Sequence, residues 1–381
     1  MGAESGARRS ILSGFRGAAS GLRGFRVLIA NGYESASGQS ASLRHYTSRM
    51  AFENHPHRAP HGGLRGLLDA LVATPQAALG VLVAQTGPSY RKPGALLLLD
   101  AHGVRAGALS GGCLDAELEE AARGVLLSGR ARIIEADTGS ADDAVFGSGS
   151  GCGGAVRIIL LPLPADSPLR AALLALTDSV APLQLTLAED GTGMAILGAT
   201  RWRWDAAGQA MHTDVQTSLP PLPIHPPPRA LLLGAGPETP ALLSMLHALG
   251  WWVEVQEHRG RWTPRASGAD RLHAQPPGSL PPLTPPPLAA LVMTHHFEHD
   301  RAHLAALAAL AASTIPDIGV IGPAVRRDAL LDALPHDLRQ RLSPRLAGPV
   351  GPRLGDGPEA IALALASALQ QWRMAHEVAG D

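Results

Sequence analysis

The spacing of hydrophobic residues along the chain changes near residue 64, where a periodic pattern begins. Residues 64–73, LRGLLDALVA, repeat apolar side chains at the spacing of a short amphipathic helix. An apolar run at 78–86 is followed by Gly-Pro, which predicts a strand. Residues 95–109 predict two more strands around a turn at 100–103. This part of the chain is therefore expected to begin with a helix and three strands.

A second predicted helix follows the sequence SGGC at 110–113. Residues 114–129 keep a helical period, carry acidic residues in the first turns and end in glycine, a common helix terminus. Strands are expected at 131–136 and 155–161, before a further helix and a hairpin. The pattern predicts a domain of mixed α/β structure over residues 61–205.

The remaining chain alternates strands and helices after a proline-rich segment. Residues 206–228 are predicted to link two domains, because 218–228 contain six prolines and no hydrophobic period. From Arg229 onward, a buried strand, a glycine turn, a helix and a second strand follow in order, and another proline cluster precedes a further strand and an alanine-rich helix. Such alternation predicts a parallel sheet with helices on both faces. The predicted fold class is α/β, with a Rossmann-like, doubly wound domain over 229–376.

Residues 1–60 differ in composition from the rest of the chain. They carry several arginines and serines, few acidic residues and no clear apolar period. This composition is similar to that of an organellar transit peptide, but we favour a disordered extension, or a mis-assigned start with translation from Met50 rather than Met1. We therefore base no fold prediction on this segment.

Composition narrows the class of protein further. Hydrophobic residues make up 45% of the chain and charged residues 17%, as in soluble globular proteins, and no apolar run is long enough to cross a bilayer. The formal net charge of -1 gives no overall attraction for nucleic acid. Two cysteines in 381 residues cannot form a disulfide framework, which favours a reducing, cytoplasmic location.

Both cysteines lie in glycine-rich loops. Cys113 follows two glycines before a predicted helix, and Cys152 lies within GSGSGCGG. Backbone N–H groups of a glycine turn and of a helix N-terminus bind anions, and Ser110 is available as a cap. A lone cysteine is most often a small buried hydrophobe, but apolar packing does not require glycine on both sides. We therefore favour functional thiols, suited to sulfur chemistry or to a soft metal, and leave open whether they pair.

The first strand of the Rossmann-like domain ends in GAGPET. Gly234 and Gly236 fit the first two positions of a dinucleotide-binding fingerprint, and Glu257 stands where a ribose-binding acid is expected. Thr239 occupies the third position, where glycine or alanine allows close helix packing. Two interpretations stay open: an NAD(P) site, or a tight strand-to-helix turn that binds no ligand.

The sequence THHFEHDRAHL places His295, His299 and His303 at four-residue spacing. On a helix, three imidazoles would share one face and could bind zinc or another borderline metal. The chain contains 16 histidines, so clusters also arise by chance. We favour the exposed stripe of an amphipathic helix, with no metal, and keep the metal site as the alternative.

Several of these motifs resemble the XdhC/CoxI family, the accessory factors of xanthine and carbon monoxide dehydrogenases. The resemblance covers residues 64–372, and the GGC turn and the GCGG loop carry most of its specificity. Pro323 and Ala324 stand where the family often has serine or basic residues, and GPRLGDG is a loosened form of a GLDIGA-type stretch. The resemblance therefore supports the cysteine site more than a site in the second domain. The matching stretches are GPSYRKPGALLLLDAHGVRAGALSGGCLDAEL, DDAVFGSGSGCGG, GAGPETPALLSMLHALGW, VMTHHFEHDRAHL, IGVIGPAVRRDALL and GPRLGDGPEAIALALA.

The resemblance implies a maturation factor rather than an enzyme. Such a protein binds the molybdenum cofactor (molybdopterin) in sulfurated form and delivers it to a molybdenum hydroxylase of the xanthine or carbon monoxide dehydrogenase type. It also implies two further partners, a cysteine desulfurase and a second copy of the chain. The alternative is an NAD(P)-dependent oxidoreductase that uses Gly234, Gly236 and Glu257.

The resemblance maps onto two sets of site residues. In the second domain it matches a polar site of Thr294, His295 and Asp300. In the first domain, Arg91 and Lys92 of the YRKPG loop are expected as anion partners. The implied cofactor contacts are Ser110, Gly111, Gly112, Cys113, Gly151, Cys152, Gly153 and Gly154.

Overall fold

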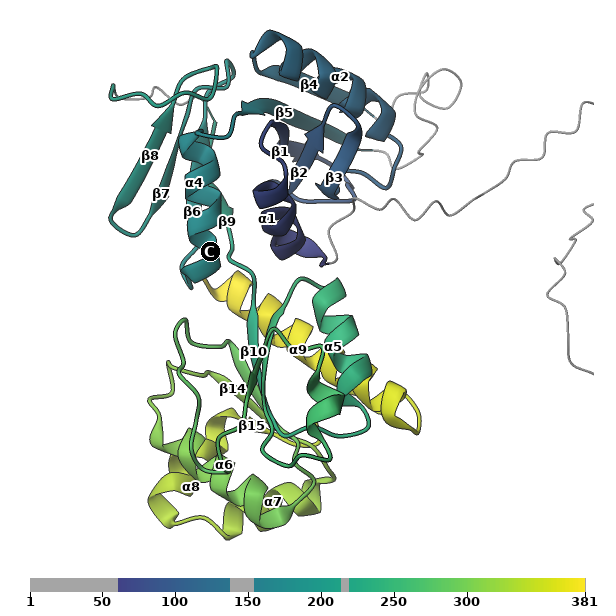
Figure 1. The fold of residues 1–381 in the computed structure, drawn as a ribbon, viewed down its shortest axis with the longest axis vertical. Coiled ribbons are helices and arrows are strands. Elements are labelled where there is room, and N and C mark those ends of the chain that lie inside the picture. Colours follow the sequence, from purple (N-terminus) through teal and green to yellow (C-terminus); the bar gives the residue numbers. More distant parts are fainter. Residues whose placement is uncertain (1–60, 138–153, 214–218, 381) are drawn as a thin grey trace, which may run out of the picture. The chain divides into compact units, whose positions relative to one another are not determined.

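The computed structural model describes residues 61–137, 154–213 and 219–380 (Figure 1). The predicted site residues Gly151, Cys152 and Gly153 lie outside these ranges, as do residues 1–60. In the described part of the chain, no helix combines the length and the apolar character that a membrane span requires.

A five-stranded antiparallel sheet forms the first layer of the N-terminal region, in the order β3-β2-β1-β5-β4. Successive side chains of its central strand β1 point to opposite faces of the sheet, and a helix covers each face, so the strand is largely buried. Leu79 and Val81 pack with α1, whereas Ala78 and Leu82 pack with α2. The elements are α1 (Gly63–Ala73), β1 (Ala77–Thr86), β2 (Leu96–Asp100), β3 (Gly103–Gly107), α2 (Asp115–Ser128), β4 (Arg132–Asp137) and β5 (Ala155–Leu163). These helices and strands confirm the elements predicted from the hydrophobic pattern.

A smaller antiparallel sheet follows, in the order β8-β7-β6-β9. Its inward side chains, including Leu185 and Trp204, share the core cluster of β1 and α1. The elements are α4 (Pro168–Leu174), the short 3-10 turn η1 (Ala175–Asp178), β6 (Leu183–Leu187), β7 (Gly193–Leu197), β8 (Thr200–Trp204) and β9 (Leu222–Ile224). The second sheet and helix α4 thus extend the core of the N-terminal region and do not form a separate core.

Strand β9 lies inside the segment for which no regular structure was predicted, so that prediction is wrong for Leu222–Ile224. The strand pairs with β6 at the edge of the sheet. Leu222 and Ile224 point into the core, and Pro223 between them is tolerated because an edge strand has one side without a partner strand.

The C-terminal sheet is parallel throughout, in the order β12-β11-β10-β13-β14-β15. This order runs outward in both directions from the first strand, as in a doubly wound Rossmann-like sheet, and confirms the predicted fold class. The elements are β10 (Arg229–Leu233), α5 (Thr239–Ala248), β11 (Trp252–Gln256), η2 (Thr263–Ala266), β12 (Arg271–His273), β13 (Ala289–Val292), α6 (Phe297–Ala309), β14 (Asp317–Val320), α7 (Ala324–Asp332), α8 (His336–Leu342), η3 (Ser343–Arg345), β15 (Leu346–Ala347) and α9 (Pro358–Gly380).

Helices cover both faces of this sheet. On one face, Leu232 and Val253 pack against α5 and α9. On the other face, Leu231 and Val292 pack against α6, α7 and α8 (Figure 1). From β10 the chain continues to β11 and β12 on one side of the sheet, and from β13 to β14 and β15 on the other side. Doubly wound folds bind ligands between the two strands where the direction changes, here β10 and β13.

Candidate functional site

The SGGC turn connects β3 to α2 and is closed by the buried side chain of Ser110. The Oγ of Ser110 accepts hydrogen bonds from the N–H groups of Gly112 (3.0 Å) and Leu114 (3.3 Å). The same hydroxyl lies 3.1 Å from Oδ1 of Asp115 and donates to it. Helix α2 begins only at Asp115, so Ser110 fixes the turn before the helix rather than capping the helix itself.

Cys113 is a free, exposed cysteine on this turn. Gly112 adopts a φ of 111°, which favours glycine, and a Cβ placed there would meet no atom within 4 Å. Over the described residues, the N–H groups of Gly111 and Cys113 have no hydrogen-bond partner within the protein. In the part of the chain that the structure describes, the thiol and these two backbone donors are therefore exposed.

The YRKPG loop lies beside the turn. Tyr90 is 66% exposed, and its ring carbon Cδ2 would be 3.8 Å from a Cβ on Gly111. Arg91 and Lys92 are exposed in the same loop. The structure therefore brings an aromatic ring to the SGGC turn, with two cationic residues next to it in sequence, and Tyr90 is a neighbour that sequence reasoning missed.

Gly154 is the first described residue after the segment that contains Cys152, and it lies against the end of β1. A Cβ on Gly154 would be 2.0 Å from the carbonyl oxygen of Pro88 and 2.9 Å from that of Thr86. Only glycine allows this close backbone approach. The predicted segments SGGC, YRKPG and Gly154 thus meet at one end of the first sheet, and we refer to Tyr90, Arg91, Lys92, Ser110, Gly111, Gly112, Cys113 and Gly154 as the cysteine site.

In the second domain, the GAGPET turn packs tightly against the backbone that follows β13. Gly234 has a φ of 107°, and a Cβ there would lie 2.6 Å from the backbone nitrogen of Thr294. The N–H of Gly236 donates to Oγ1 of Thr239 at 2.8 Å. Gly234 thus allows close packing within the protein, and the N–H of Gly236 is hydrogen-bonded to Thr239 rather than free for a ligand.

Glu257 is also engaged within the protein. Its buried carboxylate accepts hydrogen bonds from the N–H of Ala235 (2.9 Å) and from the backbone N–H (2.8 Å) and side-chain Nη2 (2.7 Å) of Arg259. Burial raises the pKa of Glu257, but the hydrogen bonds from Arg259 and Ala235 outweigh burial and hold the pKa below its usual value. The carboxylate remains charged and ties the glycine turn to Arg259.

Glu238 is the residue of this turn that sequence reasoning did not single out. It is 2% exposed, and its Oε1 lies 3.0 Å from Nε2 of His295. Both carboxylate oxygens would lie within 2.8 Å of a Cβ on Gly236. The carboxylate thus occupies the entrance to α5, where a Rossmann fold places the negatively charged pyrophosphate. An acidic residue directly before the first helical residue was the available signal.

Thr294, His295 and Asp300 lie together at the carboxyl end of β13. Oδ1 of Asp300 accepts hydrogen bonds from the N–H (3.1 Å) and the hydroxyl (2.5 Å) of Thr294, and its Oδ2 accepts from Arg326 at 2.7 Å. The hydrogen bond to Glu238 raises the pKa of His295, against the opposing effect of burial. This cluster places paired charges beside the carboxyl end of β13.

The histidine arrangement predicted as the alternative metal site is wrong. Helix α6 begins at Phe297, so His295 precedes it, with a φ of 58°, and faces Glu238 instead of sharing a helix face. His303 is buried, so the favoured prediction of an exposed stripe is also wrong at this residue, and burial lowers its pKa to about 4. His299 instead stacks on His296, with ring centroids 4.1 Å apart. Among the described residues, these three do not bring their ligand atoms within 4.8 Å of one another.

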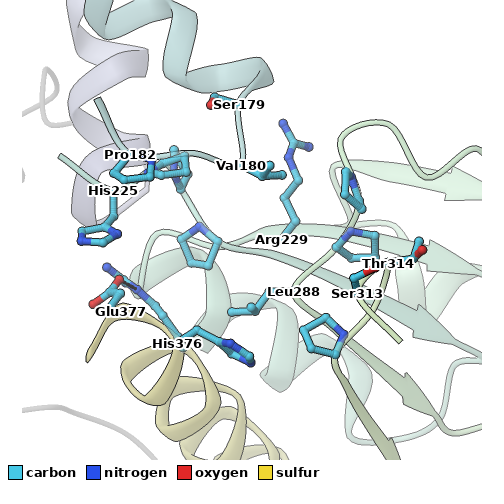
Figure 2. A pocket seen from close by; sticks show the side chains of 17 residues that line it. Ser179, Val180, Pro182, His225, Arg229, Leu288, Ser313, Thr314, His376 and Glu377 are labelled. Atoms are coloured by element: carbon cyan, nitrogen blue, oxygen red, sulfur yellow. Dashed lines mark hydrogen bonds and ion pairs between the residues drawn. The ribbon is translucent and has the colours of Figure 1, made fainter. Parts of the chain in front are cut away.

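A pocket shown in Figure 2 lies at the opposite end of the parallel sheet. It is lined by Arg229, the first residue of β10, and by Leu288, which precedes β13, together with Ser179, His225 and several prolines. Doubly wound sheets bind ligands at the carboxyl ends of their strands, and the pocket lies at the amino ends. None of the predicted site residues lines it.

Comparison with known proteins places this arrangement in a family. The XdhC and CoxI family matches residues 71–137, and the XdhC Rossmann domain matches residues 231–369. A Bacillus subtilis (strain 168) protein, named as a probable subunit of xanthine dehydrogenase, is 28% identical over 334 residues, covering 82% of this chain and 98% of that protein. A crystal structure titled as a xanthine dehydrogenase from Bacillus halodurans is similar at a TM-score of 0.67 and 26% identity, over 82% of this chain and 96% of that one. Because both domains match in order, this chain belongs to the XdhC/CoxI family.

Proposed function

We propose that this chain is an accessory factor that binds the molybdenum cofactor in sulfurated form and delivers it to a molybdenum hydroxylase of the xanthine or carbon monoxide dehydrogenase type. Family membership and the name of the Bacillus subtilis relative support a client related to xanthine dehydrogenase. The observation that carries the proposal is the free, exposed thiol of Cys113 on an open glycine turn.

The residues of the cysteine site fit the chemical groups of this cargo. The cofactor carries a phosphate, a pterin and a metal held by sulfur. Soft metals prefer sulfur ligands, and a cysteine sulfur is also the atom that carries a transferable sulfur; Cys113 offers its sulfur at the surface. The N–H groups of Gly111 and Cys113, which have no partner among the described residues, would hold the phosphate together with Arg91 and Lys92. The exposed ring of Tyr90 offers a face on which the pterin would stack.

Exposure of the thiol also suits a protein that passes its cargo on. A cysteine desulfurase would have to reach Cys113 to supply sulfur, and the hydroxylase would have to reach the bound cofactor to receive it. Both steps require an accessible thiol, which the structure provides. In this proposal the chain acts without turnover, and a second copy of the chain is a further partner.

A transfer assay tests the delivery step. The chain, loaded anaerobically with molybdenum cofactor, is mixed with a cofactor-free xanthine dehydrogenase-type hydroxylase, and the recovery of hydroxylase activity is followed. We expect recovery with the wild type and its loss with Cys113→Ser. Arg201→Gln is the matched control, since Arg201 is exposed on β8, outside the cysteine site. Equal recovery with wild type and Cys113→Ser would contradict the proposed role.

The alternative, an NAD(P)-dependent oxidoreductase, has less support from the second domain. Glu257 is bonded to Ala235 and Arg259, and Glu238 places negative charge at the entrance to α5. Like charges at this position oppose binding of a pyrophosphate. We therefore expect no saturable fluorescence change when NADH or NADPH is titrated into the protein at micromolar concentrations. Saturable binding that Gly236→Ala abolishes would favour the alternative.

A further inference from the structure

A second cluster of ligating side chains lies away from the cysteine site and from the polar residues Thr294, His295 and Asp300. His61, His247 and Asp270 each offer a ligand atom, and these three atoms lie within 4.8 Å of one another. The residues come from the segment before α1, from the last turn of α5 and from the loop before β12. We propose that they form a zinc site that fastens helix α1 to the Rossmann-like domain.

Backbone contacts hold the two histidines together independently of a metal. The N–H of Gly62 donates to the carbonyl oxygen of His247 at 3.0 Å. A Cβ on Gly62 would lie 1.8 Å from the carbonyl oxygen of Ala248, so only glycine fits between the two segments. The rings of His61 and His247 consequently meet edge to face, with centroids 5.0 Å apart. The two imidazoles are thus positioned before any ion binds.

His61 carries the outer partner that zinc-binding histidines commonly have. Its Nδ1 lies 2.6 Å from Oδ2 of Asp69, a carboxylate of helix α1. A hydrogen bond from Nδ1 leaves Nε2 as the lone-pair nitrogen, and it increases the basicity of that nitrogen. Nε2 of His247 lies 3.2 Å from Oδ2 of Asp270, so the second imidazole faces the carboxylate ligand.

Asp270 is fixed by three hydrogen bonds from two residues. Its Oδ2 accepts hydrogen bonds from the backbone N–H of Val253 and from Nη1 of Arg65, both at 2.7 Å, and its Oδ1 is bonded to Nη2 of Arg65. Arg65 also donates to the carbonyl oxygen of Trp251 at 2.6 Å and lies over the ring of Trp252. Its guanidinium is therefore held by several groups and does not depend on Asp270 alone.

The charges of the cluster favour a dication. With neutral imidazoles, the carboxylates of Asp69 and Asp270 and the guanidinium of Arg65 sum to one negative charge. Two imidazole nitrogens and one carboxylate oxygen form a donor set that zinc prefers over magnesium or calcium, with water completing the coordination. Binding requires the His247 to Asp270 hydrogen bond to give way to two bonds to the ion.

Zinc titration of the full chain, freed of metal with a chelator and carrying no histidine tag, tests the site. We expect one zinc ion per chain by calorimetry and a higher midpoint of thermal unfolding in zinc than in chelator. His61→Gln and His247→Gln should lose both effects. Asp69→Asn should weaken zinc affinity by about 10-fold to 100-fold while keeping the stoichiometry. His376→Gln, which removes an exposed histidine of α9, is the control and should leave both effects unchanged.

Cobalt supplies a readout that does not depend on the variants folding. Co²⁺ in a site of low coordination number gives intense visible absorption, so the metal-free wild type should show this absorption with saturation at one equivalent. Zinc should abolish it. Absence of saturable cobalt absorption in the wild type, or zinc stoichiometry that is the same in His61→Gln, His247→Gln and the wild type, would overturn the proposal.

Discussion

The carboxylate of Asp270 is expected to contribute strongly to stability, because it joins helix α1 to the Rossmann-like domain through Arg65. Burial raises the pKa of Asp270, but the hydrogen bonds from His247, Arg65 and Val253 outweigh burial and lower the pKa from 3.8 to about 2. A fall of about 1.8 in pKa, at about 1.36 kcal/mol per pH unit, corresponds to about 2.4 kcal/mol of stability at neutral pH. Replacement by asparagine also leaves the buried guanidinium of Arg65 without its counter-ion. We therefore expect Asp270→Asn to lower the free energy of unfolding by about 3 kcal/mol at pH 7.

The pH dependence of this effect has a definite sign. A carboxylate whose pKa is lowered by folding stabilises the folded state above its unfolded pKa of 3.8, and this contribution is lost as the pH falls toward about 2. About half of it should already be lost at pH 3. The difference between wild type and Asp270→Asn should therefore be constant from pH 7 to pH 5 and shrink at pH 3.

Urea unfolding followed by tryptophan fluorescence in the presence of chelator measures this difference at each pH. Asp356→Asn is the control, because Asp356 is exposed and its ion pair with Arg353 lies at the surface, where such pairs contribute little. A difference below about 1 kcal/mol at pH 7, or one that is unchanged at pH 3, would refute the reasoning.

Two further predictions concern the second domain. Gly234→Ala should lower the free energy of unfolding by about 2 kcal/mol or more. The φ of 107° is strained for alanine, and the added Cβ would lie 2.6 Å from the backbone of Thr294. Unchanged stability by calorimetry would contradict this prediction. Glu238→Gln should lower the pKa of His295, because the hydrogen bond to Glu238 is the main cause of its raised value. The imidazole proton resonances of His295, followed by NMR as a function of pH, measure this change, and an unaltered midpoint would count against the pairing.

The fold could largely be predicted because the spacing of apolar residues along the chain matches the helices and strands that form. Leu64–Ala73 and the strand that follows have strong periodicity, and the alternation after Arg229 defines a parallel sheet. Strand β9 was missed because three residues are too few to show a period and because Pro223 normally argues against a strand. Its formation depends on Leu222 and Ile224 filling the core beside β6, which is a tertiary effect.

The candidate sites were less accessible to sequence reasoning because hydrogen bonds and distant segments define them. The glycine turn identified Gly111, Gly112 and Cys113, but the use of Ser110 to close the turn depends on where α2 begins. Histidine spacing suggested a shared face on α6. His295 instead has a positive φ of its own, which directs its side chain away from that face. His61 and His247 lie 186 positions apart in sequence, so only the folded chain brings them together.

Cofactor retention tests the central claim most directly. The metal-free chain is incubated anaerobically with molybdenum cofactor released from a hydroxylase and passed through gel filtration, and molybdenum and pterin are then measured per chain. We predict that both co-elute with the wild type in equal amounts, and that Cys113→Ser retains neither while Arg201→Gln matches the wild type. Retention by Cys113→Ser equal to that of the wild type, or a wild type that retains no cofactor, would contradict the account.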